Sequence, residues 1–148
     1  MGNLTGSSTA EINAPIQQVW ELVEDVAKAP EWQGGLKDVR VLERDPDGRA
    51  TLCESHSDGK VRTIKSNVRF AYDGPTRLSW TQEKGDLKSV DGSWQLEDLG
   101  DGRTRATYAL DVDLGRMLGM VIRGPMVDVL RGMLVNARAG ELKKALEN

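Results

Sequence analysis

Short turn signals recur through the middle of the chain and constrain its fold more than any other sequence feature. They are Asp45-Pro46-Asp47-Gly48, Ser57-Asp58-Gly59, Asp73-Gly74-Pro75, Lys84-Gly85-Asp86 and Gly100-Asp101-Gly102. These signals lie about 10 to 16 residues apart, which suits hairpins and is too short for the helical crossovers of a parallel sheet. The segment from Leu36 to Leu114 is therefore predicted to form six antiparallel strands in a meander.

The last of these strands shows which face of the sheet is buried. Thr104, Ala106, Tyr108, Leu110, Val112 and Leu114 fall on one face of the strand. Asp111 and Asp113 fall on the opposite face, because side chains alternate along a strand. This pattern predicts a sheet with one face in water and the other packed against a second layer.

Helical patterns flank the predicted strands. After a first strand between about Leu4 and Asn13, Pro15 suits a first helical position, and the apolar residues Ile16, Val19, Trp20 and Val23 follow at helical spacing. That helix is expected to end near Val26, before a connecting turn that carries Trp32. A long helix is predicted from Pro125 to Glu147, with an apolar stripe of Met126, Val129, Leu130, Met133, Leu134 and Ala137.

These elements predict one α+β domain over residues 1–148, in which a curved seven-stranded antiparallel sheet packs against the C-terminal helix. The length of 148 residues suits a single domain. The net charge of −3 gives no basic footprint for nucleic acid, and the longest apolar run is far shorter than the roughly 20 residues of a membrane span. The single cysteine, Cys53, and the absence of a signal-peptide pattern lead us to expect a cytoplasmic protein.

Several short motifs resemble a known family in their order and spacing. They are Ile12-x-Ala14-Pro15, Val19-Trp20, Pro30-Glu31-Trp32, Gly92-x-Trp94 and Asp101-Gly102-x-Thr104. Together they resemble the START-like (SRPBCC) superfamily of helix-grip proteins, which includes polyketide cyclases/dehydrases and coenzyme Q-binding proteins. The resemblance covers about Thr9 to Leu146 and implies an apolar cavity between the sheet and the last helix. It also aligns Val68 with the place where aromatase/cyclases carry an arginine.

The residues offer few groups for catalysis. One histidine and one cysteine are too few for a protein metal site, and no motif supports a nucleotide cofactor, so neither a metal nor a cofactor is expected. A cyclase or dehydratase would need a titratable group in the cavity, for which Glu54, His56 and Tyr108 are the weak candidates.

A ligand site is the better-supported hypothesis. The candidate ligand-binding residues are Trp32, Arg62, Ile64, Val68, Phe70, Leu78, Trp80, Trp94, Tyr108, Met126, Leu130 and Met133. If Val68 and Phe70 point inward, alternation also turns Arg62 inward, where it could anchor an anionic or carbonyl group. The alternative is that Arg62 lies at the beginning of its strand and reaches water.

Three functions therefore remain open. The first is a carrier or sensor that binds a lipid, isoprenoid or polyketide-like ligand, and the second is a cyclase or dehydratase. The third is a regulatory or stress-related protein-binding module, for which an exposed apolar patch around Met117 to Ile122 would be the sign. That segment could also form a mobile lip over the cavity or a homodimer interface. No stable membrane insertion is expected.

Overall fold

The computed structural model describes residues 3–147 and confirms the predicted order of strand, helix, six strands and C-terminal helix. The strands are β1 (Asn3–Ile12), β2 (Leu36–Arg44), β3 (Ala50–Asp58), β4 (Thr63–Asp73), β5 (Arg77–Gly85), β6 (Ser89–Gly100) and β7 (Arg103–Asp113). The helices are α1 (Ile16–Glu24), the 3₁₀ helix η1 (Val26–Glu31), α2 (Gly115–Val121), α3 (Pro125–Arg131), the π-helical η2 (Gly132–Asn136) and α4 (Arg138–Glu147).

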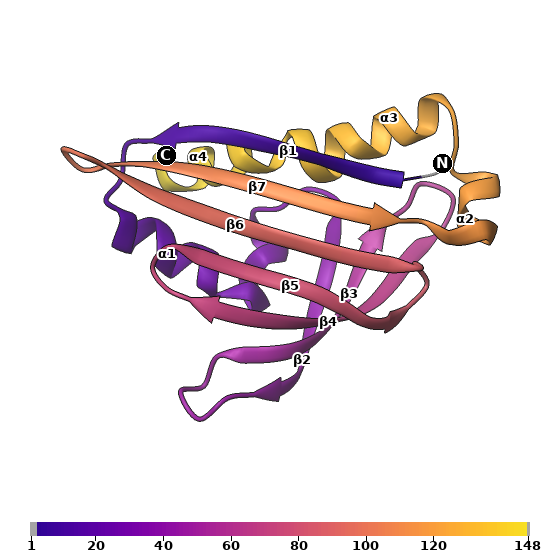
Figure 1. Ribbon diagram of the computed structural model, residues 1–148, viewed down its shortest axis with the longest axis horizontal. Helices are drawn as coiled ribbons and strands as arrows, with labels where there is room; N and C mark the ends of the chain where they lie inside the picture. Colours follow the sequence, from indigo (N-terminus) through magenta and orange to yellow (C-terminus); the bar gives the residue numbers. More distant parts are fainter. Residues whose placement is uncertain (1–2, 148) are drawn as a thin grey trace.

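Within residues 3–147, the strands form one antiparallel sheet in the order β1-β7-β6-β5-β4-β3-β2. Strands β2 to β7 form the meander that the turn spacing predicts, and the first strand, β1, pairs with the last, β7 (Figure 1). The register shifts in β2 and between Asn67 and Val68 of β4, where the pairing is irregular. Such irregularities bend strands and increase the local twist, which suits a curved sheet.

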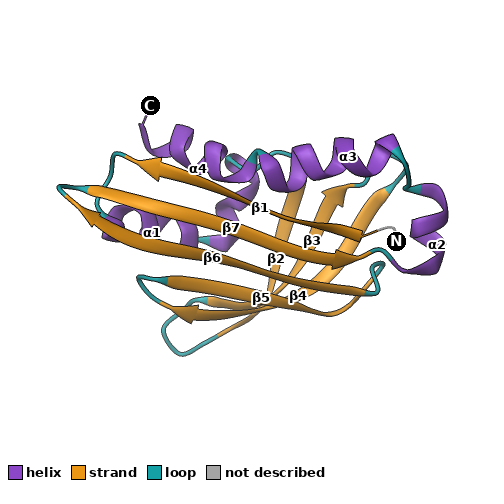
Figure 2. Ribbon diagram, turned by 45° about the horizontal axis from the view of Figure 1, so that its top comes forward, coloured by secondary structure: helices purple, strands orange, loops and turns teal. Residues whose placement is uncertain are grey.

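The C-terminal helices lie along one side of this sheet (Figure 2). Helices α3 and α4 contact β1 and α4 also contacts β7, while α1 contacts β6 and β7. On β7, Thr104, Ala106, Tyr108 and Val112 are buried beneath these helices, as the alternation predicts. Among the described residues, no helix is long and apolar enough to cross a membrane.

The C-terminal helix is not regular throughout, which corrects the expected apolar stripe. Ser8 of β1 lies at the irregular turn: its hydroxyl donates to the Val135 carbonyl at 2.9 Å and accepts from the Ala139 amide at 3.1 Å. These are the two groups that would bond to each other in an α-helix, so the inserted side chain widens the turn into η2. Val129 and Ala137, which the regular period places in the stripe, are instead exposed.

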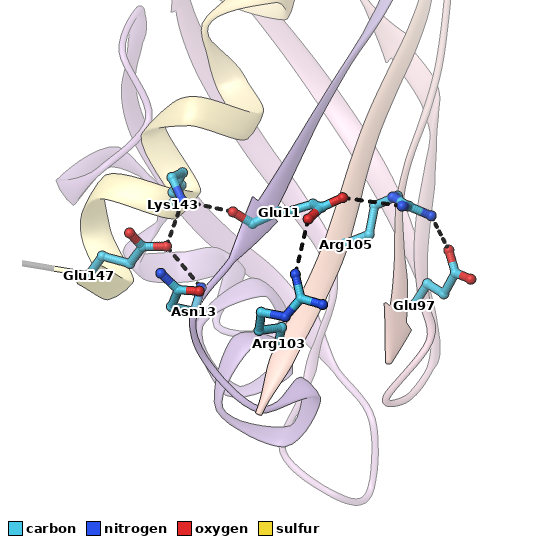
Figure 3. A network of polar contacts seen from close by, with 7 residues as sticks. All are labelled: Glu11, Asn13, Glu97, Arg103, Arg105, Lys143 and Glu147. Carbon is cyan, nitrogen blue, oxygen red and sulfur yellow. Dashed lines mark hydrogen bonds and ion pairs between the residues drawn. The ribbon is translucent and has the colours of Figure 1, made fainter. Parts of the chain in front are cut away.

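The end of α4 is fastened to β1 by polar contacts at the surface (Figure 3). Lys143 Nζ donates to the Glu11 carbonyl and to Glu147 Oε2, each at 2.8 Å. The same Glu147 oxygen accepts from the Asn13 amide at 2.8 Å. These bonds to Lys143 and Asn13 lower the pKa of Glu147 below its ordinary value of 4.5. The ionised carboxylate therefore stabilises the docked helix.

Replacing Glu147 by Gln is expected to lower the free energy of unfolding at pH 7. Because the pKa of Glu147 is depressed in the folded state, its contribution is present above pH 4.5 and is lost as the pH falls through the folded-state value. In urea titrations, the difference between the parent and Glu147→Gln should therefore shrink as the pH is lowered below 4.5 and vanish once Glu147 is protonated in the folded state. Glu21→Gln, at an exposed position of α1, is the control and should show a smaller difference at pH 7. A pH-independent difference would contradict this account.

Candidate functional site

A cavity of about 160 Å³ lies between the inner face of the sheet and the helices. One buried water needs roughly 10–15 Å³ of such space, so this cavity has room for a small organic molecule. Side chains of β3, β4 and β5 form one wall, and β6 and β7 continue it. Residues of β1, β2, α1, η1 and the C-terminal helix also line the cavity.

Most of the inward positions that strand alternation predicts do lie on this lining. They are Ile64, Val68, Phe70, Leu78, Trp80, Trp94 and Tyr108. Each comes from β4, β5, β6 or β7, where the burial alternates along the strand. A role of these residues in binding a ligand stays a prediction, but the structure brings them together around one space.

The aromatic side chains form a continuous series of ring contacts. The ring centres of Phe70 and Trp80 lie 6.0 Å apart, those of Trp80 and Tyr108 5.6 Å apart, and those of Tyr108 and Trp94 4.9 Å apart. Trp32 extends the series, with its ring centre 6.1 Å from that of Trp94. Neighbouring rings in this series are tilted by 36° to 60° to one another. Because aromatic rings are large and have few rotamers, the series gives the cavity a rigid apolar wall.

Gly92 is part of the reason why Trp80 can join this wall. The two residues are cross-strand partners on β5 and β6, and the indole of Trp80 lies directly over Gly92. A methyl group at position 92 would overlap the indole ring, so a larger residue there would displace Trp80. The glycine of the Gly92-x-Trp94 motif therefore allows an aromatic ring to lie close to the backbone.

Besides Arg62, four of the expected ligand-binding residues are placed differently. Among the described residues, the cavity lining does not include Trp32, Met126, Leu130 or Met133. Leu130 is fully buried in the core beneath α3, and Met126 and Met133 pack against the same cluster. The face of α3 that was expected to line the cavity therefore packs into the hydrophobic core instead. Trp32 does not line the cavity itself, and its ring packs against that of Trp94, which does.

Arg62 is not the inward anchor that alternation from Val68 predicts. Its side chain is 55% exposed, and its Nη2 atom lies 3.4 Å from Asp86 Oδ2. Strand β4 begins only at Thr63, so the alternation does not extend to Arg62. The alternative, in which the side chain reaches water from the beginning of the strand, is correct.

Two of the candidate catalytic residues lie away from the cavity. Cys53, Ser55 and Ser57 of β3 line it, so the alternate residues Glu54 and His56 project from the opposite face of the strand. His56 Nε2 lies 2.9 Å from Glu54 Oε2, and its Nδ1 lies 2.7 Å from Asp38 Oδ1. Glu54 and His56 thus form a polar cluster with Asp38 on the outer face, where they cannot act on a molecule in the cavity.

Tyr108 and Cys53 do line the cavity, but both are held in their protonated forms. Burial raises the pKa of the Cys53 thiol to about 11 and also raises the pKa of Tyr108. The positive charge of Arg138 acts in the opposite direction on Tyr108. At neutral pH, Cys53 is therefore a small packing residue without nucleophilic character.

Arg138 is a buried cationic residue of the cavity lining that the sequence analysis did not identify. It lies at the beginning of α4, is only 3% exposed and lines the cavity. Its Nη1 donates to the Gly34 carbonyl at 3.0 Å and to Glu141 Oε1 at 2.7 Å. The other Glu141 oxygen accepts from the Gly34 amide at 2.8 Å. The guanidinium carbon lies 5.6 Å from the centre of the Tyr108 ring, so Arg138 brings a positive charge to the aromatic wall.

The sequence around Arg138 offered only a misleading signal. Arg138 and Glu141 are three residues apart on a helix, a spacing typical of exposed ion pairs. Here Arg138 is buried and lines the cavity, and the π-helical η2 directly precedes it. An arginine on the final helix with an acidic residue three positions later could have been proposed as a buried pair, but nothing in the local pattern favoured that choice.

The segment around Met117 is partly exposed. Met117, Met120 and Val121 of α2 are exposed, with Met117 at 79%, whereas Leu118 and Ile122 are buried in the core. The exposed apolar side chains expected for a protein-binding module are therefore present on one face of α2 only. The lip, homodimer and partner-binding roles of this segment stay predictions.

Comparisons with known proteins agree with this architecture. A structure described as a START superfamily protein from Mycobacterium smegmatis has a TM-score of 0.81 and 22% identity, and the match covers 97% of both chains. The Zhui aromatase/cyclase from Streptomyces sp. R1128 has a TM-score of 0.67 and 20% identity, over 97% of this chain and 84% of that chain. These likenesses confirm the helix-grip fold.

Comparisons of sequence also find a similar protein and a matching family. The persistence and stress-resistance toxin PasT of Escherichia coli O6:H1 is 24% identical over 142 residues, which cover 94% of this chain and 89% of that protein. The model of the family described as "Polyketide cyclase / dehydrase and lipid transport" matches residues 12–138. Since this match covers most of the sequence, the chain belongs to the polyketide cyclase/dehydrase and lipid transport family.

Proposed function

We propose that this protein binds a small hydrophobic ligand in the cavity, as a carrier or sensor of a lipid, isoprenoid or polyketide-like molecule. The observation that carries the proposal is the unfilled space of about 160 Å³ beside the aromatic wall. Protein interiors are normally close-packed, so a space of this size lined by apolar side chains is typical of a ligand site. Each 100 Å² of apolar ligand surface buried there would contribute about 2.5 kcal/mol.

The placement of the polar residues favours binding over catalysis. Glu54 and His56 lie on the outer face of β3, which leaves Tyr108 as the remaining candidate at the cavity. A buried tyrosine with a raised pKa is a poor base at neutral pH. The proteins similar to this chain include one named as an aromatase/cyclase and one named as a toxin, so the likeness does not decide between activities.

A cytoplasmic location is part of the same proposal. The single cysteine, Cys53, is a buried free thiol, which fits a reducing compartment. A carrier or sensor in that compartment would need to shield an apolar molecule from water, and the cavity between sheet and helix would supply that shield.

The first test compares Val68→Phe with Val19→Phe, because both residues are buried and only Val68 lines the cavity. Adding bulk to a close-packed core normally lowers the free energy of unfolding by about 1–3 kcal/mol. Val68→Phe should cost less than about 1 kcal/mol because the new ring enters empty space, whereas Val19→Phe should cost about 3 kcal/mol. Urea unfolding would measure both values. If both variants lost a similarly large free energy of unfolding, the space around Val68 would be closed in solution.

The second test measures binding of N-phenyl-1-naphthylamine, a neutral apolar fluorophore whose emission rises in apolar surroundings. We expect saturable binding with a micromolar Kd, and Val68→Phe should weaken it about tenfold or more. Val129→Phe is the matched control, because Val129 is exposed on α3 and should leave the Kd unchanged. Native mass spectrometry after exposure to a mixed lipid extract would then identify natural ligands. Absence of both fluorophore binding and lipid adducts would overturn the proposal.

A further inference from the structure

Helix α2 presents an apolar face to solvent at one end of the molecule (Figure 1). In the part of the chain that the structure describes, six large apolar side chains are exposed, and three of them, Met117, Met120 and Val121, belong to this seven-residue helix. Positions three and four apart share one face of a helix. The opposite side is anchored, because Leu118 and the following Ile122 are buried. The three exposed side chains, which we call the α2 face, are therefore held facing outward.

The charge around the α2 face is opposite in sign to that of the whole chain. Arg116 and Arg123 flank the face and are exposed. Residues 114–127 contain these two arginines and no carboxylate, whereas the chain as a whole has a net charge of −3. The acidic residues that border this segment, Asp113 and Asp128, pair with other cations at 3.9 Å and 2.9 Å. The α2 face is thus an apolar surface flanked by positive charge, which complements a partner that is both anionic and apolar.

An anionic lipid bilayer fits this surface better than a protein partner does. A stable protein interface buries about 800 Å² on each partner, and a helix of seven residues is only about 10 Å long. A second copy of the chain, docked face to face, would also bring like charges close together. A bilayer needs no matching shape, and helices with arginines beside an apolar face bind at its headgroup boundary. The size and the charge of the α2 face therefore favour a lipid surface.

The buried side of α2 connects this surface with the cavity. Leu118 and Ile122 pack in one buried cluster with three residues of the cavity lining, Leu4, Val90 and Val112. A bilayer in contact with the α2 face would therefore lie next to the end of the cavity that this cluster lines.

We propose that the α2 face docks this protein reversibly on an anionic lipid bilayer. Met117, Met120 and Val121 would enter the boundary between headgroups and acyl chains, while Arg116 and Arg123 would bind lipid phosphates. With three apolar side chains and two arginines, the attachment is peripheral and sensitive to salt. This inference goes beyond the proposed function, because docking requires no ligand in the cavity.

Sedimentation of sucrose-loaded vesicles with the full chain, in the absence of a cavity ligand, tests the docking. One set of vesicles contains phosphatidylcholine with about 30% phosphatidylserine, and the other contains phosphatidylcholine alone. We expect binding to the anionic vesicles, and we expect it to weaken about tenfold when the salt concentration rises from about 0.05 M to about 0.5 M. Binding to phosphatidylcholine alone should be weaker at both salt concentrations.

Loss of the apolar side chains should weaken this binding. The double variant Met117→Ser and Met120→Ser should lower the partition coefficient on anionic vesicles about tenfold, because less apolar surface leaves water. Leu42→Ser is the matched control and should leave the coefficient unchanged, because Leu42 is also exposed but lies on β2. Met120→Trp should bind severalfold more tightly, since tryptophan is favoured at the headgroup level. A gain of this kind cannot come from misfolding.

Loss of the positive charge should act on the anionic vesicles alone. Arg116→Gln and Arg123→Gln should each lower the partition coefficient about fivefold on vesicles with phosphatidylserine. Neither variant should change binding to phosphatidylcholine. Arg77→Gln removes the same charge at an exposed position of β5 and is the control, with an expected change of less than about twofold.

The outcomes separate docking from the proposed function. Absence of binding to anionic vesicles would overturn this inference, and so would binding that the double variant leaves unchanged. Dimers that the double variant dissociates, together with absent vesicle binding, would assign the α2 face to a second copy and would also overturn it. Fluorophore binding in the cavity is measured without vesicles, so failure of either experiment leaves the other conclusion standing.

Discussion

The structure depends on covering the apolar face of a wide sheet with one narrow layer of helix. A helix with its side chains is about 10–12 Å across, and neighbouring strands lie about 4.8 Å apart, so one helix covers two or three strands. Helices α3 and α4 pack on β1 and β7, and α1 packs on β6 and β7. The inner faces of β3, β4 and β5 curve round towards these helices, and the space left in front of them is the cavity.

A contact with β1, at the edge of the sheet, determines which face the C-terminal helix turns towards the cavity. Ser8 of β1 inserts its hydroxyl between the Val135 carbonyl and the Ala139 amide, and the resulting π turn changes the face that α4 presents. Arg138, Ala139 and Leu142 become the buried residues of α4. The same strand thus supplies one wall of the core and sets the direction of the cationic side chain in the cavity.

The cavity combines a rigid apolar wall with one buried cationic side chain, Arg138, whose charge is compensated by Glu141. The rings from Phe70 to Trp94 resist collapse into the space, because each ring is held by the next. Arg138 is held by Gly34 and Glu141 with its charge compensated, so it can remain buried when the cavity is empty.

Local patterns in the sequence were sufficient for the sheet and for much of the cavity wall. Turn spacing predicted the meander, and alternation predicted the inward positions from Ile64 to Tyr108, because a strand's period of two is set by its backbone. Alternation left two placements of Arg62 open because it does not tell where a strand begins, and β4 begins only at Thr63.

The placement of Arg138 at the cavity was decided by tertiary structure. Ser8 and Val135 are 127 residues apart, and Arg138 and Gly34 are 104 residues apart. A helical period read from neighbouring residues cannot include such contacts. The sequence by itself therefore determined which strands form and which way their side chains face, since those follow from local backbone geometry. Only packing between distant segments decided where the final helix departs from its regular period and which charged side chain it turns into the cavity.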